Sequence, residues 1–356
     1  MSYTNGLDKP TDYFNTVLYA GDDTAIGSGG QAITGVGFQP DWVWIKRRNV
    51  DTAHHAIYDS VRGATKQLSS SQTNAETTQS EGLTAFGSDG FTVGNLGRVN
   101  EAGGRNYASW NWKANGSGSS NTDGSITSTV SANTTSGFSI VSYTGNATSG
   151  ATVGHGLGVT PDMLVVKNRD NGSYAFTVYH KSTGNSGAMF WTTTDAFGDY
   201  NGAGYLRNPN SSTFETYFTG NGNAINASGD KYIAYCFAEK KGFSKFGSYT
   251  GNGSTDGSFT YLGFRPAFII VKRADSAGSW RMWDSKRNTF NLTNKNLRPN
   301  TSDAEATSGN EIDILSNGFK ARATNGDSNG SGGSYIYMAF AENPLVGTNN
   351  IPATAR

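Results

Sequence analysis

The sequence predicts an all-β fold made of three tandem antiparallel β-sandwich repeats of the jelly-roll or lectin-like kind. The first observation is a motif of glycine, two further residues, proline and an apolar run ending in lysine, which occurs at residues 37–47, 158–168 and 263–273. The second is that apolar runs are short or alternate with period two, as in strands. The third is composition, because 47 of the 356 residues are glycine and only 16% are charged, which is typical of β-rich proteins with many loops.

A second landmark, an apolar run that opens with a tyrosine, follows each motif at a nearly constant distance. The motif prolines are Pro40, Pro161 and Pro266, and the later runs begin at Tyr107, Tyr232 and Tyr335. The separations are 67, 71 and 69 residues, so we expect one fold used three times. Each repeat has the length of a small domain and is therefore expected to have a self-sufficient core.

The repeats divide the chain into six segments. They are an N-terminal arm (1–12), repeat 1 (13–115), a linker rich in glycine, serine and threonine (116–136), repeat 2 (137–241), repeat 3 (242–344) and a C-terminal tail (345–356). The arm is polar and contains Pro10, so we expect it to dock on a partner or to stay loose. Within the linker, residues 125–130 alternate in polarity and predict one added edge strand.

Within the repeats, the run after each motif proline is continuously apolar, which predicts a central strand packed on both faces. These runs are residues 41–46, 163–167 and 267–272. The dipeptides Asp89-Gly90 and Asn317-Gly318 predict hairpin turns in repeats 1 and 3, and repeat 2 has Ser-Ser-Thr-Phe (211–214) at the equivalent position instead. Residues 60–69 are the one weak candidate for a helix.

Charge and hydropathy limit the classes of partner. The chain has 28 basic and 28 acidic side chains and a pI near 6.9, so no net field attracts it to nucleic acid or to an anionic membrane. No apolar run is long enough to span a bilayer, and residues 1–10 lack the pattern of a secretory signal. We expect no nucleic-acid partner and no membrane insertion. The single cysteine, Cys236, lies in an apolar run and is predicted to be a buried, inert thiol.

The acidic residues do not predict an enzyme. Asp59 and Asp284 occupy equivalent positions of repeats 1 and 3, where repeat 2 has His180. A glycosidase needs two carboxylates in one cleft, and residues of different repeats are not expected to share one. We therefore interpret both as solvated or turn-capping aspartates. Near matches to Gly-X-Ser-X-Gly fall in low-complexity loops, without the strand and helix that a serine nucleophile requires.

The predictions for metals and cofactors are negative. The four histidines, which include the adjacent His54 and His55, show no spacing typical of metal ligands. Acidic loop residues such as Asp22 and Asp23 supply the oxygen atoms that calcium prefers, but they favour a calcium site only weakly. We predict no catalytic residue, no metal and no cofactor.

Aromatic side chains in polar surroundings are the remaining candidates for a binding site, because sugar rings pack on exposed tyrosine and tryptophan. Most of the 7 tryptophans and 17 tyrosines lie in predicted strands, where core packing is expected. The exceptions are Tyr200, Tyr205, Trp280 and Trp283, which we predict as glycan-stacking residues.

Two stretches add a resemblance to the pattern of repeats. Residues 7–19 read LDKPTDYFNTVLY, and residues 110–130 contain WNWKANG followed by NTDGSITSTV. Together with the proline-led runs, they resemble repeat-containing proteins encoded by tailed bacteriophages, especially marine ones, over nearly the whole chain. The resemblance implies a tail-fibre-like or other virion structural protein. It implies no particular catalytic or binding residue.

We therefore expect a non-enzymatic virion structural protein on the particle surface, a tail fibre or a capsid decoration or fibre, synthesised in the host bacterial cytoplasm. Its expected partners are other virion proteins bound through the N-terminal arm, further copies of itself as a homo-oligomer with a trimer favoured, and host surface glycans. A carbohydrate-binding module protein outside the virion and a tail-associated polysaccharide depolymerase stay open as alternatives. Residues 64–82, 185–208 and 289–308, where the repeats differ most, are expected to contact partners.

Overall fold

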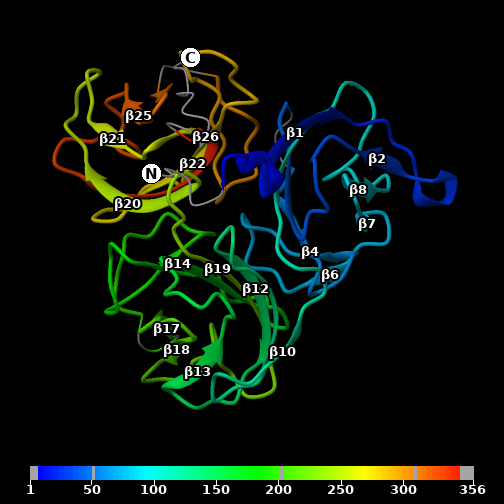
Figure 1. Cartoon of the computed structure of the whole chain (residues 1–356), viewed down its shortest axis with the longest axis vertical. Coiled ribbons are helices and arrows are strands. Elements are labelled where there is room, and N and C mark those ends of the chain that lie inside the picture. Colours follow the sequence, from blue (N-terminus) through cyan, green and yellow to red (C-terminus); the bar gives the residue numbers. More distant parts are fainter. Residues whose placement is uncertain (1–6, 50–52, 201, 203, 308–310, 345–356) are drawn as a thin grey trace.

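The computed structural model describes residues 7–49, 53–200, 202, 204–307 and 311–344. In this part of the chain the all-β prediction is confirmed, since the only helices beside the strands are two short 3-10 turns, Pro10–Asp12 (η1) and Ile26–Ser28 (η2). The strands form three lobes around a common centre (Figure 1). We call residues 7–118 lobe 1, residues 119–240 lobe 2 and residues 241–344 lobe 3.

Lobe 1 contains a four-stranded sheet, a three-stranded sheet and a two-stranded ribbon. Their orders are β1-β9-β3-β4, β2-β8-β7 and β5-β6. The strands are β1 (Phe14–Ala20), β2 (Gln31–Ile33), β3 (Trp42–Arg47), β4 (Ala56–Asp59), β5 (Lys66–Gln67), β6 (Thr77–Thr78), β7 (Leu83–Gly87), β8 (Gly90–Val93) and β9 (Asn106–Trp112).

Lobe 2 contains a seven-stranded sheet, β10-β11-β12-β19-β14-β15-β16, and a three-stranded sheet, β13-β18-β17. The strands are β10 (Ser119–Asn121), β11 (Ser128–Asn133), β12 (Phe138–Thr144), β13 (Ala151–Gly154), β14 (Met163–Asn168), β15 (Thr177–His180), β16 (Met189–Phe190), β17 (Tyr205–Arg207), β18 (Thr213–Tyr217) and β19 (Lys231–Phe237).

Lobe 3 contains a four-stranded sheet, β20-β26-β22-β23, and a three-stranded sheet, β21-β25-β24. The strands are β20 (Ser244–Thr250), β21 (Phe259–Tyr261), β22 (Phe264–Arg273), β23 (Arg281–Asp284), β24 (Ile312–Leu315), β25 (Gly318–Ala321) and β26 (Ser334–Pro344).

The three lobes share one order of strands. Neighbouring strands in the sheet follow the order β1-β9-β3-β4 in lobe 1, and this order corresponds to β12-β19-β14-β15 in lobe 2 and to β20-β26-β22-β23 in lobe 3. The three-stranded sheets correspond in the same way. We call the larger sheet of each lobe, which faces the centre of the molecule, the inner sheet, and the three-stranded sheet the outer sheet (Figure 1). Within both kinds of sheet the neighbouring strands pair antiparallel, as in the β1–β9 and β2–β8 pairs.

Each lobe encloses an apolar core between its two sheets. In lobe 1, Val43 and Ile45 of β3 meet Phe91 of β8 in this core. Lobes 2 and 3 have cores of the same kind. Residues of the same lobe therefore cover one face of each inner sheet.

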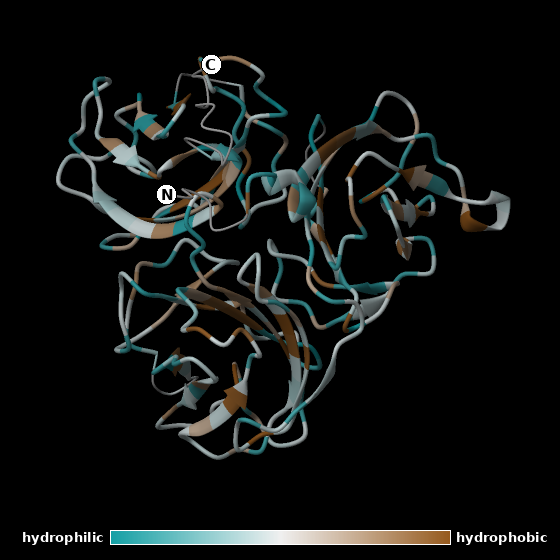
Figure 2. Cartoon of the chain, viewed as in Figure 1, coloured by the Kyte–Doolittle hydropathy of each residue, from teal (hydrophilic) through white to brown (hydrophobic). Residues whose placement is uncertain are grey.

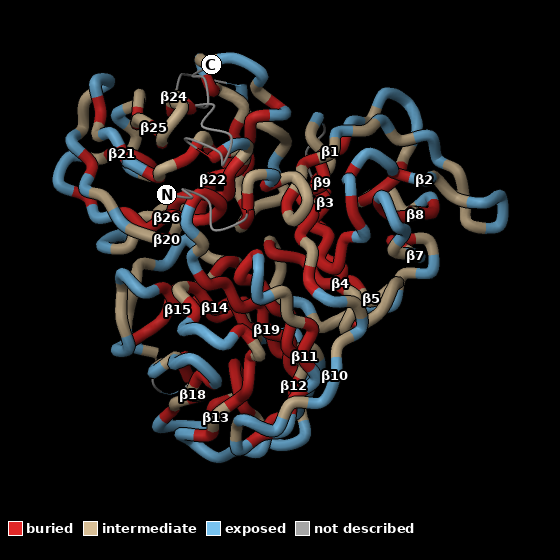
Figure 3. The backbone as a smooth tube through the Cα atoms, in the orientation of Figure 1, coloured by how far each residue is buried: buried red, intermediate tan, exposed pale blue. Residues whose placement is uncertain are grey.

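A fourth core lies at the centre of the molecule and is built by all three lobes. Because side chains alternate along a strand, Trp42 and Trp44 of β3 point away from the lobe 1 core and into this centre. There the Trp42 ring lies 4.3 Å from that of Trp112 and 4.6 Å from the Tyr235 ring of lobe 2, measured between ring centroids. Figure 2 shows hydrophobic residues along the inner sheets, and Figure 3 shows these strands buried while loops at the periphery are exposed.

The central core confirms one prediction and adds a contact between lobes that the sequence did not predict. The strands after the motif prolines are buried on both faces, as predicted; Trp42 and Val43, which point to opposite faces, are both 0% exposed. Each lobe has a core of its own, as expected, but one face of each inner sheet is also covered by the other lobes. The physical reason is that an inner sheet apolar on both faces would otherwise leave a large apolar surface in water.

The ends of the chain also differ from expectation where they are described. Leu7, in the predicted arm, is buried in the central core, and η1 contacts β26 of lobe 3. Residues 7–12 therefore pack against lobe 3 of the same chain. The first six residues of the arm and the tail, residues 345–356, lie outside the described residues.

The local predictions meet mixed outcomes. The hairpins are confirmed, because Ser88-Asp89 joins β7 to β8, which begins at Gly90, and Ser316-Asn317 joins β24 to β25, which begins at Gly318. The strand predicted in the linker is present as β11, three residues later than expected, but it lies between β10 and β12, and β10 forms the edge of the sheet. The helix at 60–69 is wrong: Gly63 and Thr65 have φ of 90° and 69°, values that end a right-handed helix.

Candidate functional site

Two of the four aromatic residues predicted to stack on sugars lie deep in the protein. Trp280 and Trp283 are 1% and 0% exposed, so the glycan-stacking prediction is corrected for both. The Trp280 indole donates a hydrogen bond to the carbonyl of Phe190 in lobe 2, at 2.8 Å, while Trp283 belongs to the core of lobe 3. Burying an indole ring stabilises the fold more than leaving it in water.

The two predicted tyrosines are also packed. Tyr205 is 6% exposed and its ring lies 5.4 Å from that of Tyr217. Tyr200 is half-buried and meets Phe190 edge to face at 4.6 Å. A signal in the sequence could have placed Trp283, since it occupies the strand position of Tyr58, directly opposite the central strand of its lobe.

The boundary between lobes 1 and 2 holds a buried charge network. Asp59 pairs with Arg62, and both side chains are 0% exposed. The Tyr235 hydroxyl of lobe 2 donates to Asp59 Oδ2 at 2.7 Å. Glu76 then bridges Arg62, at 3.1 Å, and Arg169 of lobe 2, at 2.9 Å. Burial would raise the pKa of the Glu76 carboxyl, but the two arginines outweigh this effect and hold the pKa below its ordinary value.

Lobes 3 and 1 meet through the same construction. Asp284 pairs with Arg287, again at 0% exposure for both side chains, and accepts a hydrogen bond from the Trp110 indole of lobe 1 at 3.0 Å. Glu305 bridges Arg287, at 3.0 Å, and Arg48 of lobe 1, at 2.9 Å. The interpretation of Asp59 and Asp284 as solvated residues is therefore wrong, although each also caps the turn that follows it. They lie at different lobe boundaries, which places them apart rather than in a shared cleft.

The loops expected to contact partners supply the contacts between lobes. The backbone N–H groups of Glu76, Phe197 and Glu305 donate to the carbonyl groups of Arg169, Ala274 and Arg48, respectively. Each donor comes from one of the three loops in which the repeats differ most. These loops therefore join the lobes head to tail.

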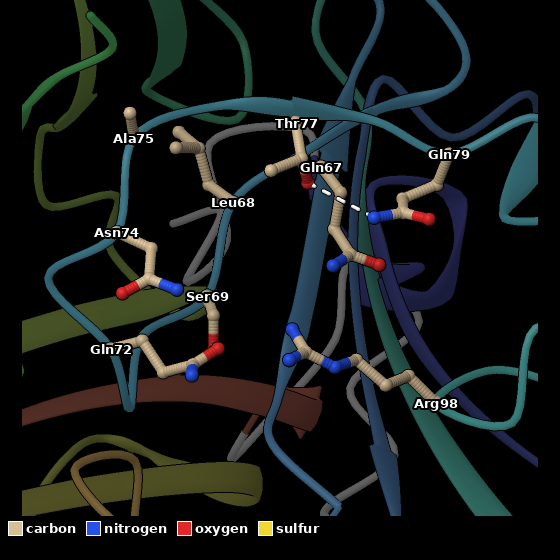
Figure 4. A pocket seen from close by; sticks show the side chains of 9 residues that line it. All are labelled: Gln67, Leu68, Ser69, Gln72, Asn74, Ala75, Thr77, Gln79 and Arg98. Carbon is tan, nitrogen blue, oxygen red and sulfur yellow. Dashed lines mark hydrogen bonds between the residues drawn. The ribbon is translucent and has the colours of Figure 1, made fainter. Parts of the chain in front are cut away.

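A polar pocket in lobe 1 is the candidate functional site (Figure 4). Its volume is about 80 Å³. The ribbon of β5 and β6, the loop between these strands and the loop between β8 and β9 supply its walls. The lining residues are Gln67, Leu68, Ser69, Gln72, Asn74, Ala75, Thr77, Gln79 and Arg98. Seven of these nine side chains are polar, and none carries a carboxylate, so the pocket suits an anion or a hydroxyl-rich group rather than a metal ion.

Arg98 gives the pocket its charge. The guanidinium group is half-buried and extends beneath Gln67 toward Ser69 and Gln72 (Figure 4). It forms no hydrogen bond or ion pair with any residue that the structure describes. Burial lowers the pKa of this guanidinium, which remains protonated at neutral pH because the ordinary pKa of arginine is so high. The pocket thus presents a cation that has no counter-ion among the residues the structure describes.

Only some of the amide groups of the pocket form hydrogen bonds within the described part of the chain. Gln67 Oε1 accepts from the Tyr58 hydroxyl at 2.7 Å, and Gln79 Nε2 donates to Thr77 Oγ1 at 3.3 Å. The Gln72 Oε1 atom, by contrast, is buried without a hydrogen-bond partner among the described residues. A ligand that donates a hydrogen bond would satisfy it.

Sequence reasoning missed this site. It pointed to residues 64–82 as a region of partner contact but gave no role to Gln67, Gln72 or Arg98. Amides and a single arginine spread over 32 residues form no motif, and only the pairing of β5 with β6 brings the loop ends together. Within the described ranges, no group of three or more His, Cys, Asp or Glu side chains is placed to hold a metal ion.

The comparisons with known proteins place the chain in a family. It belongs to the family described as Domain of unknown function (DUF7483), whose model matches residues 9–344. The match runs through all three lobes, in keeping with their shared central core. No curated protein and no solved structure matches the sequence. The described part of the chain has no helix long and apolar enough to cross a membrane.

Proposed function

We propose that the protein is a non-enzymatic structural protein on the surface of a bacteriophage virion, a tail fibre or a capsid decoration or fibre, that contacts host surface glycans. In this proposal the lobes are three repeats of one jelly-roll-like or lectin-like sandwich. The common strand order and the core between two sheets in each lobe support this assignment. The resemblance of the sequence to proteins of tailed phages supports the location.

The observation that carries the proposal is the closed ring of three lobes around one apolar core. The central core draws on all three inner sheets, and buried charge networks lock two of the three boundaries. A ring of this kind is a rigid scaffold, and it turns its loops outward (Figure 3). Rigid β scaffolds that present loops are suited to assembly and surface contact.

Partners complete the proposal. The protein attaches to other virion proteins through its N-terminal segment and assembles as a homo-oligomer, with a trimer favoured. It is synthesised in the bacterial cytoplasm and incorporated into the particle.

One observation favours a second candidate. The pocket around Arg98 offers a cation and free hydrogen-bonding groups to a polar ligand. A carbohydrate-binding protein that acts outside the virion would use such a pocket as well.

Labelling of purified virus with an antibody against this protein, followed by electron microscopy, separates these candidates. Label on the tail supports a tail fibre, and label over the head supports a capsid decoration. Particles without label, together with free protein in the lysate, overturn the virion proposal and leave the carbohydrate-binding candidate. Reducing ends released from host polysaccharide by the purified protein would overturn the non-enzymatic assignment.

A further inference from the structure

We propose that the lobe 1 pocket binds the carboxylate of an acidic sugar, with Arg98 as the anchoring cation and the surrounding amides and hydroxyls as partners of the sugar hydroxyl groups. The inference rests on the glycan-contacting part of the proposed function, for which it names a site and a ligand class.

The first step is the charge of Arg98. Every arginine that is fully buried in the described part of the chain has a carboxylate partner: Arg62 pairs with Asp59, Arg281 with Glu311 and Arg287 with Asp284. Arg98 is half-buried and has none. Partial removal of a guanidinium from water without a compensating anion is costly. A bound carboxylate would offset this cost, and its two oxygens match the planar fork of the guanidinium.

The second step compares the three lobes at this position. One asparagine in each lobe identifies equivalent positions in the loops. Its Oδ1 atom accepts a hydrogen bond from a backbone N–H group nearer the start of the same lobe. These residues are Asn100 (from Asp22, 2.7 Å), Asn226 (from Asn146, 2.8 Å) and Asn329 (from Asn252, 3.0 Å). Arg98 lies two residues before Asn100, so its counterparts are Ala224 in lobe 2 and Asp327 in lobe 3.

In lobe 3 the corresponding position is occupied by an ion pair between two residues of that lobe. Asp327 pairs with Arg281 at 2.8 Å, and Arg281 Nη1 also donates to Asn296 at 2.9 Å. Asn296 is the counterpart of Gln67, because each of them forms a β-bridge with the segment that follows it in its own lobe.

Lobes 1 and 2 lack this internal pair for different reasons. In lobe 1 the counterpart of Arg281 is Ala56, which is too small to fill the space. In lobe 2 the counterpart of Arg98 is the buried Ala224, 2% exposed, so no charge is present. Among the residues that the structure describes, lobe 1 alone therefore combines a cation without a carboxylate partner with an open pocket at this position.

The third step is the chemistry of the other lining groups. Gln72 Oε1 needs a donor, and a sulfate dianion supplies only acceptors, whereas a sugar hydroxyl donates and accepts. Asn74 and Thr77 are exposed at the rim, so a ligand can enter from solvent. The volume of the pocket admits a carboxylate with the adjoining edge of one sugar ring, and the rest of a glycan would lie outside.

The test is calorimetric titration of the full chain with four acidic oligosaccharides: oligogalacturonate, oligomannuronate, a hyaluronan tetrasaccharide and sialyllactose. Each is paired with its methyl ester, which keeps the ring hydroxyls but removes the charge. We expect at least one acid to bind and its ester to bind at least tenfold more weakly. Inorganic phosphate is titrated as the probe for an anion site that does not recognise sugar.

Three variants locate the binding. Arg98→Gln should weaken it at least tenfold, and Gln72→Leu should weaken it severalfold, both without a decrease in melting temperature, since neither side chain bonds a described residue through the altered atoms. Lys286→Gln removes the same charge from an exposed position on lobe 3 and should leave binding unchanged.

Several results would overturn the inference. They are no binding of any acid, equal binding of acid and ester, loss of binding in Lys286→Gln as large as in Arg98→Gln, or phosphate binding as tight as that of the sugars. Virion labelling gives an independent answer on the proposed function. A labelled particle whose protein binds no acidic sugar removes this site alone, and sugar binding by a protein absent from the particle removes the virion proposal alone.

Discussion

Two of the three lobe boundaries contain a buried aspartate–arginine pair, and at the third a histidine occupies the position of the aspartate. Asp59 and Asp284 hold the boundaries of lobe 1 with lobes 2 and 3, whereas His180 stands at the same position between lobes 2 and 3. The backbone contact is nonetheless the same at all three boundaries. The backbone contacts therefore determine how the lobes approach each other. The buried position of Asp59, His180 and Asp284 requires a polar group with a hydrogen-bond partner, but it does not require a charge.

His180 meets that requirement as a neutral side chain. Its Nδ1 atom accepts the backbone N–H of Ser182 at 3.1 Å, so Nε2 carries the proton and donates to the carbonyl of Tyr337 in lobe 3 at 3.2 Å. Burial lowers the pKa of His180 to about 4. At neutral pH this boundary therefore contains no counterpart of the Asp59–Arg62 pair.

The largest expected effect comes from breaking a buried pair. Asp59→Ala and Asp284→Ala should each lower the free energy of unfolding by about 3–5 kcal/mol, because each leaves a buried arginine without its nearest counter-ion. Urea denaturation monitored by tryptophan fluorescence measures the loss.

The control for this prediction is Asp123→Ala, an exposed aspartate in lobe 2, which should change the stability by less than about 0.5 kcal/mol. A loss below about 1 kcal/mol in both buried variants would mean that these networks do not lock the boundaries.

A smaller effect is expected from protonation of His180. The unfolded chain binds a proton at this histidine near its ordinary pKa of about 6.5, whereas the folded protein does so only near pH 4. The unfolded state therefore holds more protons between these values. The contribution of His180 is fully present above about pH 6.5 and is lost as the pH falls toward 4, by about 3 kcal/mol.

The His180→Gln variant isolates this contribution. Burial lowers the pKa of His54, His55 and His155 as well, so the parent protein and the variant must be compared over the same pH range. The difference in unfolding free energy between them should shrink from pH 7 to pH 4. A constant difference would show that His180 titrates normally in the folded state.

The smallest effect is expected at the outer ends of the charge networks. Arg169→Met and Arg48→Met should each lower the free energy of unfolding by only about 1–2 kcal/mol, because Glu76 and Glu305 keep their buried arginine partners. Both arginines are partly exposed, so the cost should fall at high salt. Unfolding of each variant in 0.05 M and 1 M salt measures this.

Ala274 provides the natural comparison, because it occupies the position of Arg169 and Arg48 at the boundary without a charge. An exchange of Ala274 for serine should show no such dependence on salt. Equal salt dependence in all three variants would assign the effect to the whole protein rather than to the outer ion pairs.

Much of the secondary structure could be predicted from local sequence. The hairpins at Asp89-Gly90 and Asn317-Gly318 follow from residues that tolerate the turn conformation. The burial of Cys236 follows from its apolar run and is confirmed. The failures concern residues whose environment comes from another lobe: Trp280 looked exposed among polar neighbours in the sequence, but its indole reaches a carbonyl of lobe 2.

The sequence by itself determined the all-β class, the threefold recurrence of one motif and the strands with two apolar faces, because hydrophobic period and turn chemistry act between residues close in the chain. Only the tertiary structure decided what covers the second face of each inner sheet, which aspartates form buried contacts between lobes, and that Arg98 has no carboxylate partner in the described part of the chain. Burial and charge pairing depend on atoms brought together from distant parts of the chain. The Asp284–Trp110 hydrogen bond joins residues 174 positions apart, a relation that no local pattern encodes.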